Sequence, residues 1–273
     1  MQKVKTSIPK RNQVETVEKI SSFIEDKVNE SNTSGIVIGL SGGLDSSTTA
    51  YLCAKTIKKD KILGIIMPTV TTPIEDIEDA IVVAEKLGIE YEVIHVDELI
   101  APFKEICIHT TNKDFKNTEY SDIANANLKA RIRMMILYYH ANNLNRLVVG
   151  TGNRSELLVG YFTKHGDGGV DLLPIGDLYK TEVRTLASQL GVPKEIIEKP
   201  PTAGLWAGQT DEEELGIKYE LLDRILYLMV DEKMKDNDIS QKLEIPLSEV
   251  LRIKKKVESS VHKLKPAPSP DTN

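Results

Sequence analysis

The sequence is poor in cysteine and contains no long apolar run. Only Cys53 and Cys107 occur among its 273 residues, and they form no Cys-x-x-Cys pair, which argues against a zinc site or a disulfide framework. No stretch approaches the roughly 18 apolar residues that a membrane-spanning helix needs. The charged N-terminus also lacks the apolar centre of a signal peptide. We therefore expect a cytoplasmic protein without membrane segments.

An excess of positive charge is also absent. The chain carries 35 basic and 41 acidic residues, which gives a formal net charge of -6. Proteins whose affinity depends on covering nucleic-acid phosphates carry clustered positive charge, so this composition disfavours nucleic acid as the main partner. A local basic site remains compatible with it. The length fits one large α/β core with additions.

Short β-branched runs alternate with longer amphipathic stretches. The runs predict buried parallel strands at residues 35–40, 61–67, 91–96 and 146–150. The stretches predict helices at residues 45–59, 73–87 and 119–144. This alternation is typical of an α/β fold in which a doubly wound parallel sheet is flanked by helices on both faces.

The predicted elements divide the chain into regions. We expect a single domain over residues 1–258, with the core sheet at about 35–176 and a helical C-terminal segment at about 178–258. The closing residues 259–273 are rich in proline and predict a tail with a disordered end.

The carboxyl ends of parallel strands are where such sheets bind ligands. The loops that begin at Ser41, Pro68, Asp97 and Gly150 should therefore share one rim. Residues 161–177 are rich in glycine and aspartate and are too long for a simple connection, which favours a binding loop or lid.

The turn after the first predicted strand has the composition of a phosphate site. Residues 41–47 read SGGLDSS and lead directly into a helix, where backbone N–H groups and the helix dipole suit an anion. The turn lacks the Gly-Lys pair of a Walker A loop and is not Gly-x-Gly-x-x-Gly. A carboxylate at Asp45 among phosphates requires a divalent cation between them. A helix N-cap made by Ser41 or Asp45 is the alternative interpretation.

The SGGLDSS turn resembles the pyrophosphate-binding loop of the ATP pyrophosphatases. These enzymes cleave ATP between the α- and β-phosphates and activate a substrate oxygen as its adenylate, and the resemblance implies an adenine nucleotide alpha hydrolase-like fold. Further stretches resemble the ammonia-dependent NAD synthetases over nearly the whole chain: NANLKARIRMM (125–135), GTGNRSE (150–156), YFTKHGDGGVDLLPIGDLYK (161–180), PTAGLW (201–206), DEEELGIKY (211–219) and SSVHKLK (259–265). Such enzymes are ligases that convert deamido-NAD to NAD with ammonia, ATP and magnesium, releasing AMP and pyrophosphate.

The resemblance implies a set of site residues. The positions matching ATP-binding residues are Gly39, Leu40, Ser41, Gly42, Gly43, Leu44, Asp45, Ser46, Ser47, Thr151, Lys180 and Thr202. The positions matching deamido-NAD contacts are Arg131, Lys164, Asp171, His262 and Lys263. Asp45 and Glu156 are the expected Mg²⁺ ligands. The candidate catalytic residues are Asp45, Asp167 and Lys180, with Asp167 orienting or deprotonating the incoming ammonium.

Plainer interpretations stay open for several of these residues. Glu156 could be a surface glutamate at a helix start, and Arg131 could be a solvated partner of Glu119 or Asp122. His262 and Lys263 could belong to a solvated basic tail. Asn153 and Arg154 depart from the charged or histidine-containing version of GTGNRSE that many family members carry, which leaves the contacts at that helix start uncertain.

The nitrogen source and the assembly are also implied by the resemblance. Glutamine-using relatives carry a large extra domain, whereas only some thirty residues precede the first predicted strand here, so we expect ammonia as the donor. A homodimer is implied as well. The apolar character of residues 119–144 on nearly all sides suits a helix that is buried on two sides.

Two other functions compete with this interpretation. The first is another adenylating enzyme of the same superfamily, either tRNA-modifying or similar to GMP synthetase. The second is a nucleotide-binding or DNA-binding regulator, because residues 236–257 resemble a helix-turn-helix with a basic second helix. Similar helices can equally pack on the main core, and the net negative charge disfavours DNA.

Overall fold

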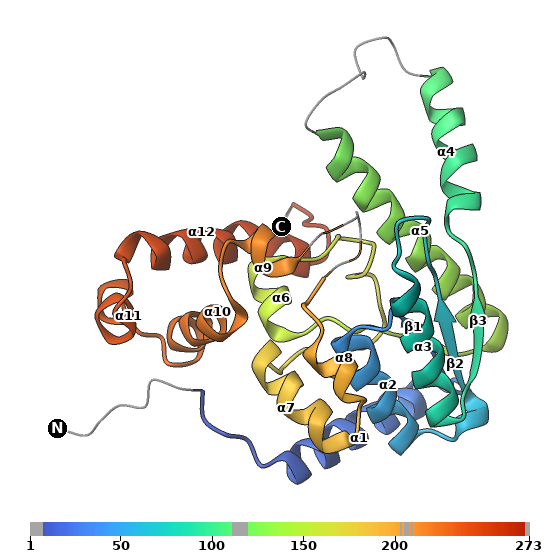
Figure 1. Cartoon of the computed structure of the whole chain (residues 1–273), viewed down its shortest axis with the longest axis horizontal. Helices are drawn as coiled ribbons and strands as arrows, with labels where there is room; N and C mark the ends of the chain where they lie inside the picture. Colours follow the sequence, from blue (N-terminus) through green and yellow to red (C-terminus); the bar gives the residue numbers. More distant parts are fainter. Residues whose placement is uncertain (1–7, 111–119, 203, 205–207, 209, 271–273) are drawn as a thin grey trace.

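Four parallel strands form the central sheet of the protein, in the order β3-β2-β1-β4 (Figure 1). The computed structural model describes residues 8–110, 120–202, 204, 208 and 210–270. The strands are β1 (Ile36–Leu40), β2 (Ile62–Ile66), β3 (Glu90–Val93) and β4 (Leu147–Val149). Their parallel pairing confirms the predicted sheet, and an isolated bridge between Val149 and Leu172 extends it towards residue 176.

The burial predicted for the third strand is wrong. All four residues of β3 are exposed, whereas β2 is buried throughout. The difference arises because β3 lies at the sheet edge and pairs only with β2. An edge strand needs fewer apolar contacts than a central one, and the alternating Glu90 and Glu92 are consistent with that position.

Helices cover both faces of the sheet, because alternate strand residues point to opposite sides. Ile36, Ile38 and Leu40 pack with α1, α2, α3 and α7 in one cluster. Val37 and Leu63 face α4 and α5 in another. The helices are α1 (Gln13–Glu30), α2 (Leu44–Thr56), α3 (Ile74–Leu87), α4 (Asp97–Thr110), α5 (Tyr120–Leu144), α6 (Arg154–Val159), α7 (Lys180–Leu190) and α8 (Lys194–Glu198), with a 3-10 turn η1 (Lys59–Lys61).

The C-terminal helices form a second packed group beside the sheet, on the left of Figure 1. They are α9 (Asp211–Leu215), α10 (Tyr219–Leu226), the π-helical turn η3 (Tyr227–Asp231), α11 (Asp236–Leu243) and α12 (Leu247–Leu264). Ile239, Leu243, Val250 and Ile253 of the helix-turn-helix-like segment are buried in this group. The segment therefore packs against the rest of the protein, which agrees with the alternative that such helices pack on a core rather than bind DNA.

The C-terminal end of the chain differs from the prediction in one respect. The boundary expected at residue 258 falls inside α12, so His262 and Lys263 lie in the last turn of that helix. Residues 265–270 have no regular structure, and the far end of the expected disordered segment, residues 271–273, lies outside the described residues. Among the helices that the structure describes, none is long and apolar enough to cross a membrane.

Candidate active site

A cavity of about 480 Å³ opens at the carboxyl ends of the strands. Three of the four predicted rim loops line it, through Ser41, Pro68 and Gly150. Asp97 instead accepts a hydrogen bond from Val70 N at 2.6 Å and so braces the loop that follows β2. The cavity is also lined by residues of α5, of the 160–173 loop and of the starts of α7 and α9, and by Lys263 from α12.

The SGGLDSS turn places the start of α2 at this cavity. Gly42 has a φ of 73°, and a Cβ there would lie 2.1 Å from Asp76 O, so α3 packs against the turn at a position that only glycine fits. Gly43 caps α2 without a side-chain hydrogen bond. The N-cap role considered for Ser41 or Asp45 is therefore wrong.

The turn leaves donors unused at its helix start. Within the described residues, the N–H groups of Leu44, Asp45 and Ser46 have no acceptor, and all three residues line the cavity. The hydroxyls of Ser41 and Ser46 lie 2.9 Å apart. A helix start with free N–H groups and hydroxyls beside it is suited to phosphate oxygens.

Lys180 joins the two expected metal ligands. Its ammonium group donates to Asp45 Oδ2 and, at 3.1 Å, to Glu156 Oε1. The lysine side chain is 4% exposed and the carboxylates are 17% and 16% exposed. The three charges come from α2, α6 and α7, so the fold gathers residues far apart in sequence into one cluster.

Burial sets the electrostatics of this cluster. Burial acts to lower the pKa of Lys180, but the charges of Asp45 and Glu156 outweigh it and raise that pKa. Burial raises the pKa of Glu156 to about 8, with Lys180 opposing and Asp45 reinforcing the shift. Burial likewise raises the pKa of Asp211, which lines the same cavity. Lys180 therefore stays protonated. The raised pKa values of Glu156 and Asp211 indicate that Lys180 alone does not fully compensate the negative charge of these acids.

Asn153, a departure from the family pattern, has a defined place in the cluster. It is fully buried and donates from Nδ2 to Asp45 Oδ1 at 3.1 Å. Its Oδ1 accepts from Glu156 N, and Glu156 Oε2 accepts from Asn153 N, which forms a capping box at the start of α6. Glu156 therefore faces the cavity from a capped helix start and is not a surface residue.

The donor atoms of the cluster fit a hard divalent cation. Asp45 and Glu156 offer carboxylate oxygens, which Mg²⁺ prefers. Among the residues described by the structure, no group of three or more His, Cys, Asp or Glu side chains is arranged to hold a metal ion. A cation bound here would therefore take its remaining ligands from water and from phosphate oxygens, as Mg²⁺ commonly does.

The residues matched to deamido-NAD form a second group, beside the cavity. Arg131 donates to Lys164 O at 3.3 Å through Nη2, and Lys164 Nζ donates to His262 O at 2.9 Å. Lys263 Nζ donates to Gly160 O and Phe162 O at 2.7 and 2.8 Å. The fold thus brings α5, the 160–170 loop and the end of α12 together. Lys263 lines the cavity, and Arg131 bonds to backbone rather than to Asp122, whereas Glu119 lies outside the described residues.

Asp167 and Asp171 occupy different places in the 161–177 loop. Asp167 lines the cavity and accepts from Thr163 N at 2.9 Å. Its pKa is raised, chiefly by burial, while the bond from Thr163 opposes the shift. Asp171 accepts from Val148 N at 2.7 Å and from Tyr138 Oη at 2.9 Å, so its carboxylate ties the loop to β4 and α5.

The remaining expected ATP contacts divide into two sets. Gly39, Leu40, Gly43, Thr151 and Thr202 line the cavity, whereas Gly42 and Ser47 do not. Ser47 is 1% exposed, so its hydroxyl is sealed beneath the turn. Thr202 also accepts a hydrogen bond from Gly204 N at 3.0 Å, so its hydroxyl stabilises a turn as well as lying at the cavity.

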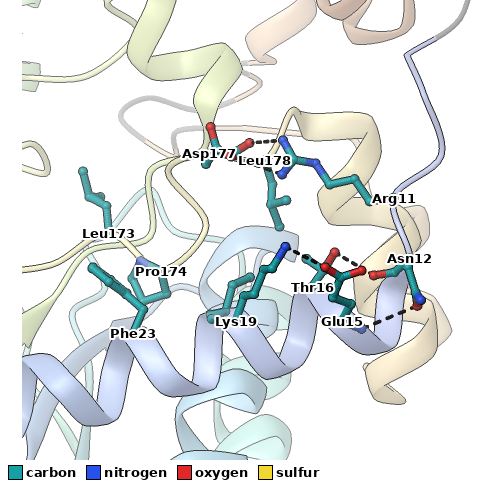
Figure 2. Close-up of a pocket in the computed structure, with 11 residues that line it drawn as sticks. Arg11, Asn12, Glu15, Thr16, Lys19, Phe23, Leu173, Pro174, Asp177 and Leu178 are labelled. Carbon is teal, nitrogen blue, oxygen red and sulfur yellow. Dashed lines mark hydrogen bonds and ion pairs between the residues drawn. The ribbon is translucent and has the colours of Figure 1, made fainter.

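A second cavity of about 460 Å³ lies between the start of α1 and residues 173–178 (Figure 2). Its charged groups pair with one another or with neighbours. Arg11 donates to Asp177 and Glu182, and Lys19 pairs with Glu15. The lining therefore anchors the N-terminal helix and presents little free charge to a ligand.

Asp223 is a supporting residue that the sequence did not reveal. It is fully buried on α10 and accepts from Ser155 Oγ at 2.5 Å, Thr181 N at 2.9 Å and Thr181 Oγ1 at 2.8 Å. Ser155 precedes Glu156, and Thr181 follows Lys180. One carboxylate thus fixes the two helix starts that carry the cluster. An isolated aspartate in a helical segment gives no sequence signal of this role.

We predict that Asp223 makes stability depend on pH. Burial raises its pKa to about 6 from the ordinary aspartate value of 3.8, although its hydrogen-bond donors oppose the shift. The folded state therefore binds more protons between these values, and the unfolding free energy falls as pH rises through them. Asp223 should therefore lower the unfolding free energy by about 3 kcal/mol between the lower and the higher of these pH values.

Chemical denaturation of the wild type and Asp223→Asn at about pH 4 and about pH 7 measures this effect. The stability of the wild type minus that of the variant should be larger at the lower pH. A difference that is the same at both pH values would contradict the raised pKa.

Known proteins place the chain in a family. It matches the NAD synthase family over residues 16–267. It is 56% identical over 223 residues to the NH(3)-dependent NAD(+) synthetase of Archaeoglobus fulgidus, covering 81% of this chain and 86% of that protein. It is 51% identical over 257 residues to the enzyme of the same name from Methanocaldococcus jannaschii, covering 94% and 96%. The structure of NMN synthetase from Francisella tularensis matches with a TM-score of 0.82 and 33% identity, over 96% of this chain and 100% of that one. These similarities confirm the resemblance and the adenine nucleotide alpha hydrolase-like fold, and the chain belongs to the NAD synthase family.

Proposed function

We propose that the protein is an ammonia-dependent NAD synthetase, a ligase that amidates deamido-NAD to NAD at the expense of ATP. The observation that carries this proposal is that one cavity is lined both by residues 44–46, whose N–H groups have no acceptor within the described residues, and by the Asp45–Lys180–Glu156 cluster. Relatives at 56% and 51% identity bear the name NH(3)-dependent NAD(+) synthetase. The other adenylating enzymes of the superfamily and a regulator are not favoured.

The first step joins the substrate to AMP. A carboxylate oxygen of deamido-NAD attacks the α-phosphorus of ATP, and pyrophosphate leaves. The free N–H groups at the start of α2 and the hydroxyls of Ser41 and Ser46 are placed to hold the leaving pyrophosphate. Lys180 supplies fixed positive charge. Phosphoryl chemistry of this kind depends on positioning and charge neutralisation.

Magnesium would be held by Asp45 and Glu156. Their carboxylate oxygens are suitable ligands, and bound there the ion would neutralise phosphate charge. Asp45 also keeps its contacts with Lys180 and Asn153, which orient the carboxylate towards the turn.

The second step replaces AMP by ammonia. The nitrogen attacks the acyl carbon, loses a proton, and expels AMP as the amide forms. Asp167 lines the cavity from the 163–170 loop, and the direction of its pKa shift suits a carboxylate that accepts a proton. Thr151 and Thr202 are proposed as ATP contacts. Arg131, Lys164, Asp171, His262 and Lys263 are proposed as the deamido-NAD side of the site.

The mononucleotide acid is a second candidate substrate, because a matching structure is that of an NMN synthetase. We favour the dinucleotide since the relatives at higher identity are named as NAD synthetases. Assays with each acid, ATP, Mg²⁺ and ammonium, following amide, AMP and pyrophosphate, decide between them. A preference for the mononucleotide, or no amide from either acid, would contradict the proposal.

We predict that Asp45→Asn lowers NAD formation at least about 100-fold, because it removes a charge that holds both Lys180 and the cation. Pyrophosphate release should fall in parallel, since the first step is lost. Asp26→Asn, an exposed site on α1, is the control and should retain wild-type rates. Retained pyrophosphate release in Asp45→Asn would count against its role.

We predict a different pattern for Asp167→Asn. Loss of a general base typically costs about 100-fold or more, and here the loss should fall on NAD formation while a first turnover of pyrophosphate is retained. The Michaelis constant for ammonium should also rise. Quenched-flow measurement of both products tests this, and equal loss of the two would show that Asp167 has no specific role with ammonia.

We also propose that the protein is a cytoplasmic homodimer. Exposed apolar side chains follow α4 and α5, which extend beyond the sheet in Figure 1: Leu99, Phe103, Ile106, Ile123, Met135 and Tyr139. Exposed apolar side chains concentrated on two neighbouring helices favour association. Sedimentation should give a dimer that Met135→Glu weakens and Val14→Glu, on exposed α1, leaves intact. A monomeric wild type at micromolar concentration would contradict the proposal.

A further inference from the structure

The cavity contains more acidic than basic side chains, although both proposed substrates are anions. Its described lining includes five cationic residues, namely Arg133, Lys180, Arg184, Lys199 and Lys263, and six acidic ones, namely Asp45, Asp76, Glu156, Asp167, Asp211 and Glu214. A polyanionic ligand gains most from a cation whose charge is not already neutralised.

Four of the five cations are committed to acceptors of the protein. Lys180 bonds to Asp45 and Glu156, and Lys199 bonds to Asp76 and Asp79. Arg184 pairs with Glu220 at 2.9 Å. Lys263 donates to two backbone carbonyls.

Arg133 differs from these four. Within the described residues it forms no ion pair, and its hydrogen bond is from Nε to Met67 O at 3.1 Å. That bond fixes the guanidinium at the carboxyl end of β2 and leaves both terminal nitrogens available as donors. The side chain is half-buried in the cavity, so its charge is only partly solvated.

The loop that carries Asp167 packs on α5 around Arg133. A Cβ at Gly166 would lie 2.9 Å from Ala130 Cβ, and one at Gly169 would lie 3.2 Å from Met134 Cγ. Arg133 and Asp167 are close enough to interact electrostatically. The guanidinium therefore lies on the side of the cavity where the ammonium is proposed to arrive.

The reaction removes a negative charge at its reacting group. Deamido-NAD and NAD share their phosphates and differ in that a carboxylate becomes a neutral amide. A guanidinium with two free donors matches a carboxylate in a forked geometry and has no such match with an amide. Lys180 and the N–H groups at the start of α2 are already proposed to bind the phosphates, so Arg133 is available for the carboxylate.

From these contacts we infer that Arg133 binds the reacting carboxylate of deamido-NAD and selects this acid over the amide product. The inference rests on the proposed function, since it assigns a role within the same site. Arg133, which lines the cavity, is thereby added to the residues expected to contact deamido-NAD.

Binding measurements on Arg133→Gln and Arg133→Lys test this role. Calorimetry with deamido-NAD, NAD and a non-hydrolysable ATP analogue gives three affinities for each protein. We expect the preference of the wild type for deamido-NAD over NAD to fall roughly 10- to 100-fold in Arg133→Gln. Arg133→Lys should keep part of it, and ATP-analogue affinity should change little.

Arg184→Gln is the matched control, because Arg184 lines the same cavity but pairs with Glu220. Its acid-over-amide preference should equal that of the wild type. A merely structural role of Arg133 would weaken both dinucleotides equally and so leave the ratio unchanged. That result, a loss confined to the ATP analogue, or the same loss in Arg184→Gln would each overturn the inference.

Failure of the inference and failure of the proposed function have different signatures. If the wild type forms no NAD from deamido-NAD, the proposed function fails whatever the variants bind. If the wild type forms NAD and Arg133→Gln keeps the acid-over-amide ratio within about twofold, the inference fails alone.

Discussion

The site depends on one buried ammonium group that is held between two carboxylates. Lys180 contacts Asp45 and Glu156, and these residues begin three different helices. A buried charge network costs desolvation energy and repays it only when every member is paired. The cluster therefore fixes the relative positions of α2, α6 and α7, and it does so where residues of the SGGLDSS turn line the cavity.

The surrounding residues hold this cluster without taking part in the chemistry. Asn153 orients Asp45 and caps α6, and Asp223 binds the residues next to Glu156 and Lys180. Gly42 allows α3 to approach the turn because no side chain stands between them. Asn153 and Asp223 also satisfy polar groups that would otherwise be buried without a partner, so the geometry of the site and the stability of the fold rest on the same contacts.

We propose that two parts of the cavity have different functions. The proposed phosphate part is formed by the turn, Asp45, Glu156 and Lys180. The other part is formed by α5 and the 160–170 loop, where Asp167 and Arg133 are close enough to interact electrostatically. An enzyme that adenylates a carboxylate and then aminates it requires these two environments to meet, because the same carbon takes part in both steps.

The sequence alone determined the parallel sheet and the family, and it predicted a phosphate site at the turn, since strand periodicity and the SGGLDSS motif are local signals. It did not predict α1 or α4, and it misjudged the burial of β3, because burial depends on whether a strand has neighbours on both sides. The contacts of Asn153 and Asp223, and the unpaired state of Arg133 among the described residues from which we infer its role, were decided only by the tertiary structure. Hydrogen bonds between residues many positions apart, and a cavity cation that forms no ion pair within the described residues, exist only when the folded chain brings the groups together or keeps them apart.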